Sequence, residues 1–281
     1  MSRFGVYQIS KSPAKVASKV TNKKSKLPLV VGGLAVYLGI TYLSFSYFKL
    51  SKPEEEKKLP LKEKDSTSSF NSTYDHIADT YDKKIGFDET LMGLGLLRRW
   101  LIKNVKGDVL EVSAGTGRNL PYYQETRYNN LTLTDQSEPM LAQAKEKMHQ
   151  YSKRVGGEEK VNFEVMNVEK AKYPDNSFDT VVSTFSVCSY DDPVKALVEM
   201  QRVCKPDGHV LLLEHGKSNY SWLNNILDTQ AEKHASQWGC WWNRDITGLI
   251  HKAGLQVVYQ SRWHLGTTYY IIAKPTPNST A

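Results

Sequence analysis

Cysteine is scarce in this chain, and its spacing bears on two kinds of site. Of 281 residues only three are cysteines, Cys188, Cys204 and Cys240. They lie far apart, are odd in number and contain no C-x-x-C pair, which argues against a disulfide framework or a zinc cluster. Acidic residues are absent from residues 1–26, which hold seven lysines and arginines. The remaining 30 basic residues balance 30 acidic ones, so no nucleic-acid partner is expected.

Charge is also absent from Leu27–Phe48, LPLVVGGLAVYLGITYLSFSYF. As a helix, these 22 residues are long enough to cross roughly 30 Å of hydrocarbon. We therefore predict one transmembrane helix. A buried core helix is the alternative, but the charged, proline-containing run Lys49–Asp65 separates the segment from any core. A removable secretory signal would have a shorter apolar core and a shorter basic region before it.

The acid-free segment 1–26 is rich in Ser and Lys, as mitochondrial presequences are, although it is poor in Arg. We expect a basic targeting segment followed by a single-pass anchor in the mitochondrial inner membrane. Because basic flanks stay on the matrix side, the domain would face the intermembrane space. An endoplasmic-reticulum anchor has similar chemistry. The predicted organisation continues with a charged linker at 49–69, a folded domain at 70–275 and a tail at 276–281.

Strand-like and helix-like segments alternate after residue 70. Two helices are expected first, over 72–85 and 88–105, with Asp88 as the N-cap of the second. Short apolar runs follow and are predicted as strands: DVLEV, LTLTD, VNFEVM, FDTVVSTF and HVLLLEH, then LQVVYQSRW and TTYYIIAK. Two of the segments between them, EPMLAQAKEKMHQYSKRV and DPVKALVEMQRVCK, have the pattern of helices. This alternation predicts an α/β fold, a mostly parallel sheet with helices on both faces, ending in an antiparallel edge pair.

The stretch VLEVSAGTGRNL, residues 109–120, predicts a ligand loop. A strand that ends in a tight glycine loop and opens a helix is where open α/β sheets bind ligands. The dinucleotide pattern G-x-G-x-x-G would need a third glycine where Leu120 stands, which weakens a hydride-transfer reading. The pattern E-x-G-x-G-x-G is filled by Glu111, Gly115 and Gly117, with Ser113 at the first glycine. A side chain there predicts an ordinary negative φ for Ser113.

The glycine loop resembles that of class I S-adenosylmethionine (SAM) methyltransferases, and its neighbours extend the resemblance. Asp135 ends the second strand, NVEKAKYPDNSFDTVV and EMQRVCKPDGHVLLLE match later family motifs, and YDHIADTYD looks like a lid helix over the cofactor. The resemblance implies a Rossmann-like methyltransferase fold with SAM as cofactor. Glu111 would meet the methionine amino group, Asp135 the ribose hydroxyls, and Asn167 with Val168 the adenine. The implied cofactor residues are Glu111, Ser113, Ala114, Gly115, Thr116, Gly117, Asp135, Gln136, Asn167, Val168 and Thr184.

A narrower resemblance rests on SVCSYDDP, LLLEHG and GCWWNRDITGLIHKAGLQVV. These runs are similar to a methyltransferase-like group that includes animal membrane-anchored thiol methyltransferases and fungal Oms-type mitochondrial inner-membrane proteins. The anchor and VLEVSAGTGRN bring the chain nearest to the fungal proteins. This resemblance implies membrane attachment and SAM binding, without supplying a substrate.

The acceptor side is expected at the ends of the fourth and fifth strands. Thr184 and Phe185 would line a transfer pocket, facing Glu214 and His215, the two weak candidates for a catalytic base. A lone histidine at a strand end is more often an ordinary hydrogen-bonded residue. Cys188 fits packing better than an acceptor or redox role, and Cys204 fits the core.

The tryptophan-rich run WGCWWNRD allows two interpretations. Trp238, Trp241 and Trp242 either form an apolar wall over the acceptor site, with Asn243 and Arg244 reaching inward, or pack a helix onto the sheet. Alternatively, Asp245 could cap the N-terminus of a following helix and Arg244 could form an ion pair there. Gly254 is the expected end of that helix.

Three functions remain open from the sequence. The first is a membrane-anchored methyltransferase acting on a small or lipophilic acceptor. The second is a SAM-fold protein with a structural or assembly role, suggested by Ser113 and by the lack of a recognisable base. The third, a protein or RNA methyltransferase, lacks the Asn-Pro-Pro-Tyr-type signature, because STFSVCSY follows the fourth strand instead.

Overall fold

A computed structural model describes residues 71–276 of the chain. The predicted targeting segment, transmembrane helix and linker lie outside the described residues, as does the tail from residue 277. Within residues 71–276, no helix is long and apolar enough to cross a membrane.

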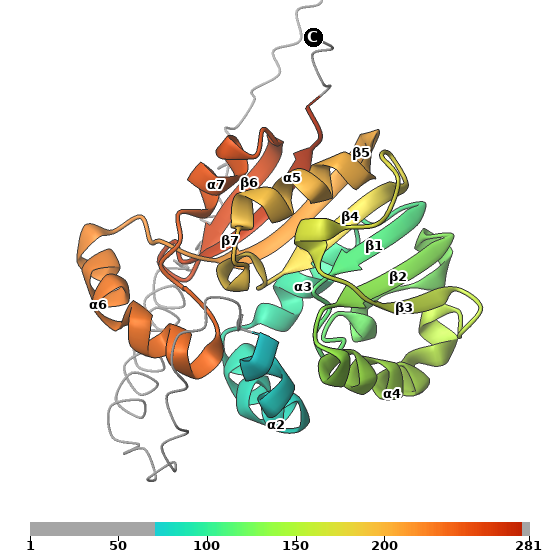
Figure 1. The fold of residues 1–281 in the computed structure, drawn as a ribbon, viewed down its shortest axis with the longest axis horizontal. Helices are drawn as coiled ribbons and strands as arrows, with labels where there is room; N and C mark the ends of the chain where they lie inside the picture. Colours follow the sequence, from blue (N-terminus) through green and yellow to red (C-terminus); the bar gives the residue numbers. More distant parts are fainter. Residues whose placement is uncertain (1–70, 277–281) are drawn as a thin grey trace, which may run out of the picture. The chain divides into compact units, whose positions relative to one another are not determined.

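The domain is built on one seven-stranded sheet, with the strand order β3-β2-β1-β4-β5-β7-β6 (Figure 1). The strands are β1 Asp108–Val112, β2 Asn130–Asp135, β3 Val161–Val165, β4 Phe178–Thr184, β5 Cys204–His215, β6 Gln256–Trp263 and β7 Thr268–Lys274. β1 to β5 pair in parallel, whereas β7 runs antiparallel to both β5 and β6. The predicted mostly parallel sheet and its antiparallel pair are therefore confirmed.

Helices cover both faces of the sheet, as predicted. α5 Pro193–Val203 and α7 Ile246–Lys252 pack on one face, and α3 Leu94–Ile102 and α4 Glu138–Val155 pack on the other. Successive residues of a strand point to opposite faces, so Leu110 joins the first core and Val109 the second. Each face thus has its own hydrophobic core.

The N-terminal helices differ from the prediction. α2 Asn71–Leu91 continues through Asp88, whose carbonyl accepts a helical hydrogen bond from Met92 N at 2.9 Å. The predicted N-cap at Asp88 is therefore wrong. The chain breaks at Gly93, the N-cap of α3, where φ is 68° and glycine is favoured.

The segment between β5 and β6 contains two helices, α6 and α7. α6 Ser221–Trp238 follows β5 and ends at Gly239, whose φ is 65°. The prediction for the next helix is confirmed in outline: Asp245 caps α7 through a 3.0 Å hydrogen bond from Gly248 N, and Gly254 with φ 78° follows its end.

Candidate active site

The glycine loop after β1 leaves room for a ligand at one of its two glycines. A Cβ added at Gly115, whose φ is 57°, would meet no atom within 4 Å. A Cβ at Gly117, with φ 73°, would come within 2.6 Å of Leu120 Cδ1. Gly117 therefore serves packing, whereas Gly115 borders open space. The loop leads into a short 3₁₀ helix, Leu120–Tyr122, so the expected helix N-terminus does not form there.

Asp135, at the end of β2, lies against this loop. Gly115 N donates to Asp135 Oδ2 at 2.8 Å, and Ser137 N donates to Oδ1 at 2.9 Å. Each carboxylate oxygen keeps a second lone pair that can accept a hydroxyl. Burial raises the pKa of Asp135 to about 6, although these backbone donors oppose the shift. Gln136 follows directly and is half-buried.

Glu111, inside β1, is almost fully buried and already hydrogen-bonded. Tyr123 Oη donates to one carboxylate oxygen at 2.7 Å, and Asn119 Nδ2 donates to the other at 2.9 Å. Burial raises the pKa of Glu111 to about 7. Glu111 therefore stands near half-protonation at neutral pH, so a cation placed beside it would favour the charged form.

The backbone at Ser113 contradicts the prediction of a negative φ. Its φ is 50°, in the left-handed region. Ala114 N still donates to Thr134 O at 2.8 Å, so the chain bends at Ser113 while it remains attached to β2. Ser113 Oγ lies 3.0 Å from Tyr190 Oη, which gives the side chain a partner in this conformation.

The predicted adenine contacts lie beside Asp135. Met166 N donates to Asp135 O at 2.8 Å, which fixes the start of the next loop against β2. Asn167 Oδ1 accepts from Glu169 N at 2.8 Å and so caps a short 3₁₀ helix, in which Val168 is buried. The glycine loop, Asp135 and Asn167 thus gather at the carboxyl ends of β1, β2 and β3.

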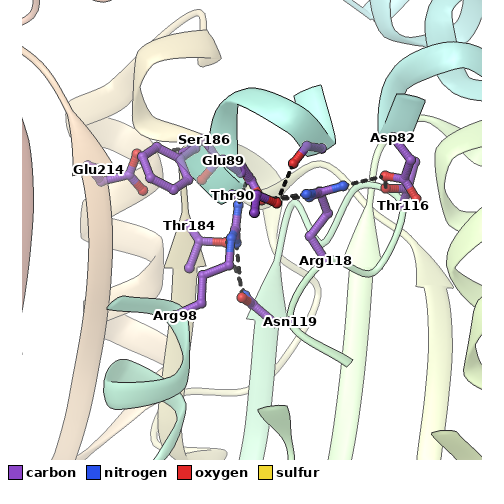
Figure 2. Close-up of polar contacts among 12 residues, drawn as sticks. Asp82, Glu89, Thr90, Arg98, Thr116, Arg118, Asn119, Thr184, Ser186 and Glu214 are labelled. Carbon is purple, nitrogen blue, oxygen red and sulfur yellow. Dashed lines mark hydrogen bonds and ion pairs between the residues drawn. The ribbon is translucent and has the colours of Figure 1, made fainter. Parts of the chain in front are cut away.

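An ion-pair network that sequence reasoning missed lies behind the loop (Figure 2). Arg98 of α3 is nearly buried, and its Nη2 lies 2.7 Å from Glu89 Oε1. Its Nη1 donates to Thr184 Oγ1 at 2.8 Å and to Asn119 Oδ1 at 2.9 Å. A basic residue on the leucine-rich face of a short helix was the signal in the sequence.

α2, which contains the expected lid segment, is hydrogen-bonded to the glycine loop. Asp82 accepts from Thr116 Oγ1 at 2.6 Å and from Arg118 Nη1 at 3.1 Å, as Figure 2 shows. Lys147 of α4 also pairs with Asp82. Arg118 Nη2 lies 2.5 Å from Glu89 Oε2. Two carboxylates of α2 therefore fasten this helix to the loop and to α4.

The predicted acceptor residues meet at the ends of β4 and β5. Glu214 is fully buried, and burial raises its pKa to about 8. Its carboxylate accepts from Ser183 Oγ at 2.7 Å and from Ser186 N at 2.9 Å, so it holds the turn after β4. The His215 ring lies 5.5 Å from the ring of Phe185.

Two of the three cysteines are brought together with His215. One ligand atom from each of Cys188, His215 and Cys240 lies within 4.8 Å of the others, and the cysteines are free. Sequence spacing alone therefore does not exclude a metal cluster, because the ends of separate elements meet in space. Cys204 lies in the core, as predicted.

The tryptophan-rich run favours packing over an inward-facing wall. The Trp242 ring stacks on His234 at 3.9 Å, and its Nε1 donates to Leu227 O at 3.0 Å, both on α6. Asn243 Nδ2 donates to Asp228 Oδ1 of the same helix at 2.7 Å. Arg244 does turn inward and donates to backbone carbonyls after β4.

Known proteins are similar to this chain in sequence and in fold. The family described as a methyltransferase domain matches residues 110–212. The protein named "Methyltransferase OMS1, mitochondrial" of Saccharomyces cerevisiae is 41% identical over 212 residues, covering 72% of this chain and 45% of that protein. This chain therefore spans just under half of that relative. "Ubiquinone/menaquinone biosynthesis C-methyltransferase UbiE" of Rickettsia bellii is 34% identical over 181 residues, covering 60% of this chain and 69% of that protein.

Solved structures support the fold alone. A chain of the complex between the Haloferax volcanii Trm112 methyltransferase activator and a putative methyltransferase matches with a TM-score of 0.56 at 18% identity, covering 73% of this chain and 98% of that one. The [4+2]-cyclase SpnF matches with a TM-score of 0.57 at 15% identity, covering 74% and 95%. A cyclase on this fold shows that the fold does not fix the reaction.

The site and the relatives lead to the same family. SAM is the family's cofactor, and the residues fit it: open space borders Gly115, and Asp135 beside it keeps lone pairs for hydroxyl groups. The chain belongs to the class I SAM-dependent methyltransferases.

Proposed function

We propose that the protein is a membrane-anchored methyltransferase of the mitochondrial inner membrane that methylates a small or lipophilic acceptor. The main observation in support of a cofactor site is the 2.8 Å hydrogen bond between Gly115 N and Asp135, next to the open space at Gly115. This bond joins the glycine loop after β1 to the carboxylate at the end of β2, the two features for which the sequence predicted contacts with SAM.

Each cofactor role follows from the position of a side chain. Asp135 would accept the ribose hydroxyls, and Glu111 would face the methionine ammonium, directly or through water. Asn167 and Val168, at the next strand end, would border the adenine. α2, fastened by Asp82, would close the site from above and exclude water. SAM itself supplies a methyl group already activated on a sulfonium.

A group of exposed apolar side chains supports work beside a bilayer. The rings of Trp100 on α3 and Trp263 on β6 lie 6.0 Å apart, and each residue is 43% exposed. Leu96 and Tyr259, on the same two elements, are 56% and 53% exposed. Exposed tryptophan and tyrosine side chains suit the membrane interface, where one end of the ring is apolar and the other wet.

The relatives favour the same class of acceptor and the same compartment. The UbiE proteins are named for ubiquinone and menaquinone biosynthesis, and the yeast relative is named as mitochondrial. A quinone precursor is a lipophilic small molecule, and an apolar anchor at residues 27–48 would hold the domain near such substrates. His215 and Glu214 remain the candidate bases. Glu214 is the poorer candidate, because its carboxylate already binds the turn after β4.

The test uses the full chain in lipid nanodiscs. Calorimetry should show binding of SAM and of its demethylated product. SAM carrying a labelled methyl group should then label one class among quinones, phospholipids, small thiols and proteins. The absence of heat and of any thermal shift at millimolar SAM would remove the enzyme proposal.

One observation favours the alternative, a structural or assembly role. Ser113 places a side chain with φ 50° at the position of the first loop glycine. Tight SAM binding without turnover on any acceptor class would favour this role, whereas turnover on one class would exclude it.

A further inference from the structure

Three metal-ligating side chains meet at the carboxyl ends of β4 and β5, although the sequence separates them widely. Cys188 lies in the 3₁₀ helix Val187–Ser189 after β4, His215 ends β5, and Cys240 follows α6. Their ligand atoms all lie within 4.8 Å of one another, and His215 Nε2 is 2.8 Å from Cys240 Sγ. Both cysteines are buried, whereas His215 is half-buried.

Hydrogen bonds to backbone atoms hold the segments of Cys188 and Cys240 together, and no bond joins the two sulfur atoms. Trp241 N donates to Cys188 O at 2.9 Å, so the residue after one cysteine is fixed to the other cysteine. Arg244 Nη1 donates to Val187 O at 2.7 Å, which adds a second link between these segments. His234 Nδ1 lies 3.0 Å from Cys240 O and anchors the second segment to α6. The ligand positions are therefore set by the backbone.

The spacing of the three ligands suits a tetrahedral zinc ion. Zinc–sulfur bonds of about 2.3 Å and zinc–nitrogen bonds of about 2.0 Å place tetrahedral ligand atoms roughly 3.5–3.8 Å apart. The 2.8 Å contact would have to open, and the longest separation, at most 4.8 Å, would have to close. Each change is about 1 Å or less, which side-chain rotation can supply.

The chemistry of the ligand set points to the same ion. Two thiolates and one neutral imidazole are soft ligands that select zinc over magnesium or calcium. Two thiolates also neutralise a divalent cation, so the complex carries no net charge into a buried site. A disulfide between Cys188 and Cys240 would satisfy the sulfur atoms but would leave His215 without its partner.

We propose that the protein binds one zinc ion through Cys188, His215 and Cys240, with a fourth coordination position open. Three protein ligands and an open position are the pattern of catalytic zinc sites, whereas structural sites have four protein ligands. Phe185, directly after β4, and the hydroxyl of Tyr74 on α2, which lies 2.7 Å from Ser189 Oγ, border the group. The ion would therefore face the expected acceptor side, and His215 would serve as a ligand instead of a base. Zinc binding does not rest on the proposed function.

The experiment measures zinc in the full chain, expressed with added zinc and purified in nanodiscs without a histidine tag. Mass spectrometry of the metal content should find about one zinc per chain. Cys188→Ser and Cys240→Ser should each lower this content at least fivefold. Cys204→Ala, which removes a cysteine from the core, is the matched control and should leave the content unchanged. Cys240→His, which keeps a ligand, should retain part of the zinc.

A spectroscopic measurement on the unmutated chain covers the case in which a serine variant fails to fold. Cobalt added to the zinc-depleted chain should give tetrahedral visible bands and a thiolate charge-transfer band that saturate at one equivalent. X-ray absorption at the zinc edge should show two sulfur ligands. A chain without zinc or cobalt bands, unchanged zinc in both serine variants, or a Cys188–Cys240 disulfide found under reducing purification would each overturn the proposal.

Discussion

Ser113 combines an unfavourable backbone conformation with a specific hydrogen bond. A non-glycine residue in the left-handed region typically costs about 1 kcal/mol or more, and this one has φ 50°. The bond between Ser113 Oγ and Tyr190 Oη, at 3.0 Å, returns part of that cost. The serine is thus tolerated because the turn after β4 supplies a partner.

We predict that Ser113→Gly and Tyr190→Phe are coupled. In the Tyr190→Phe background, where the hydrogen bond is gone, Ser113→Gly should raise the free energy of unfolding by about 1 kcal/mol. In the native background the gain should fall to near zero, since the glycine also removes the bond. Urea unfolding of the four variants measures the coupling. Identical effects in both backgrounds would show that the bond contributes nothing.

Asp135→Ala should weaken SAM binding by roughly 1.5–3 kcal/mol, the usual scale for hydrogen bonds to a charged group. The fold should persist, because Asp135 lies at a strand end and bonds only loop groups. Calorimetry gives the affinity, and circular dichroism checks the fold. An unfolded variant would mean that Asp135 is structural, and a folded variant with native affinity would mean that Asp135 does not bind the cofactor.

The raised pKa of Glu111, about 7, predicts proton release when SAM binds. The ammonium of the cofactor favours the carboxylate and so lowers this pKa, and affinity should rise as pH increases from about 6 to about 7.5. Near pH 6.5 binding should release a substantial fraction of one proton, measured by calorimetry in buffers of different ionisation heats. Asp135, with a pKa of about 6, should add a smaller share. Glu111→Gln should remove the part of the proton release that comes from Glu111.

The stability of the cofactor-free protein should depend on pH in the opposite sense. The pKa of Glu111 is raised from 4.5 in the unfolded reference to about 7 in the fold. Between these values the native state binds more protons than the unfolded state. The Glu111 contribution to stability therefore rises as pH falls through this window.

At the scale of elements, a few charged contacts join α2 to the glycine loop and to α4. Although partial burial opposes it, hydrogen bonds from Lys147 and Thr116 hold the pKa of Asp82 below its usual value, so Asp82 is charged at neutral pH. The side chain of Asp82 is 38% exposed, so each contact is partly screened by water. Contacts of this kind can break, and α2 can move away from the loop, without unfolding of the domain.

We predict that Asp82→Asn speeds the release of SAM about three- to tenfold while changing domain stability little. Stopped-flow displacement of a fluorescent SAM analogue measures the rate. Asp88→Asn, on the same helix but exposed and outside this network, is the control and should release SAM at the native rate. Equal rates in all three proteins would show that α2 does not limit release.

At the scale of the whole molecule, the domain and the predicted anchor set a topology that can be tested. Residues 1–26 carry seven positive charges and no acidic residue, which favours their retention in the matrix. Protease added to mitochondria whose outer membrane alone is ruptured should therefore digest the methyltransferase domain. A matrix protein in the same preparation is the protected control. Full protection of the domain would place it in the matrix.

The sequence by itself determined the sheet, the loop and the cofactor class. Strand runs such as LTLTD and the E-x-S-x-G-x-G loop depend on alternation and on local turns, which nearby residues specify. α4 runs from Glu138 to Val155, as its pattern predicted, because Ser137 caps it locally through its side chain. Gly115 and Asp135 lie close together because the ends of the adjacent parallel strands β1 and β2 lie side by side.

Only the tertiary structure decided the features that join distant segments. The left-handed turn at Ser113 depends on Tyr190, which follows the fourth strand and has no local signature. Arg98 gains its partners from α2 and β4, and the long-range packing that buries it is not readable from a helix of nine residues. Cys188, His215 and Cys240 meet because separate elements end at one edge of the sheet, which sequence spacing cannot express.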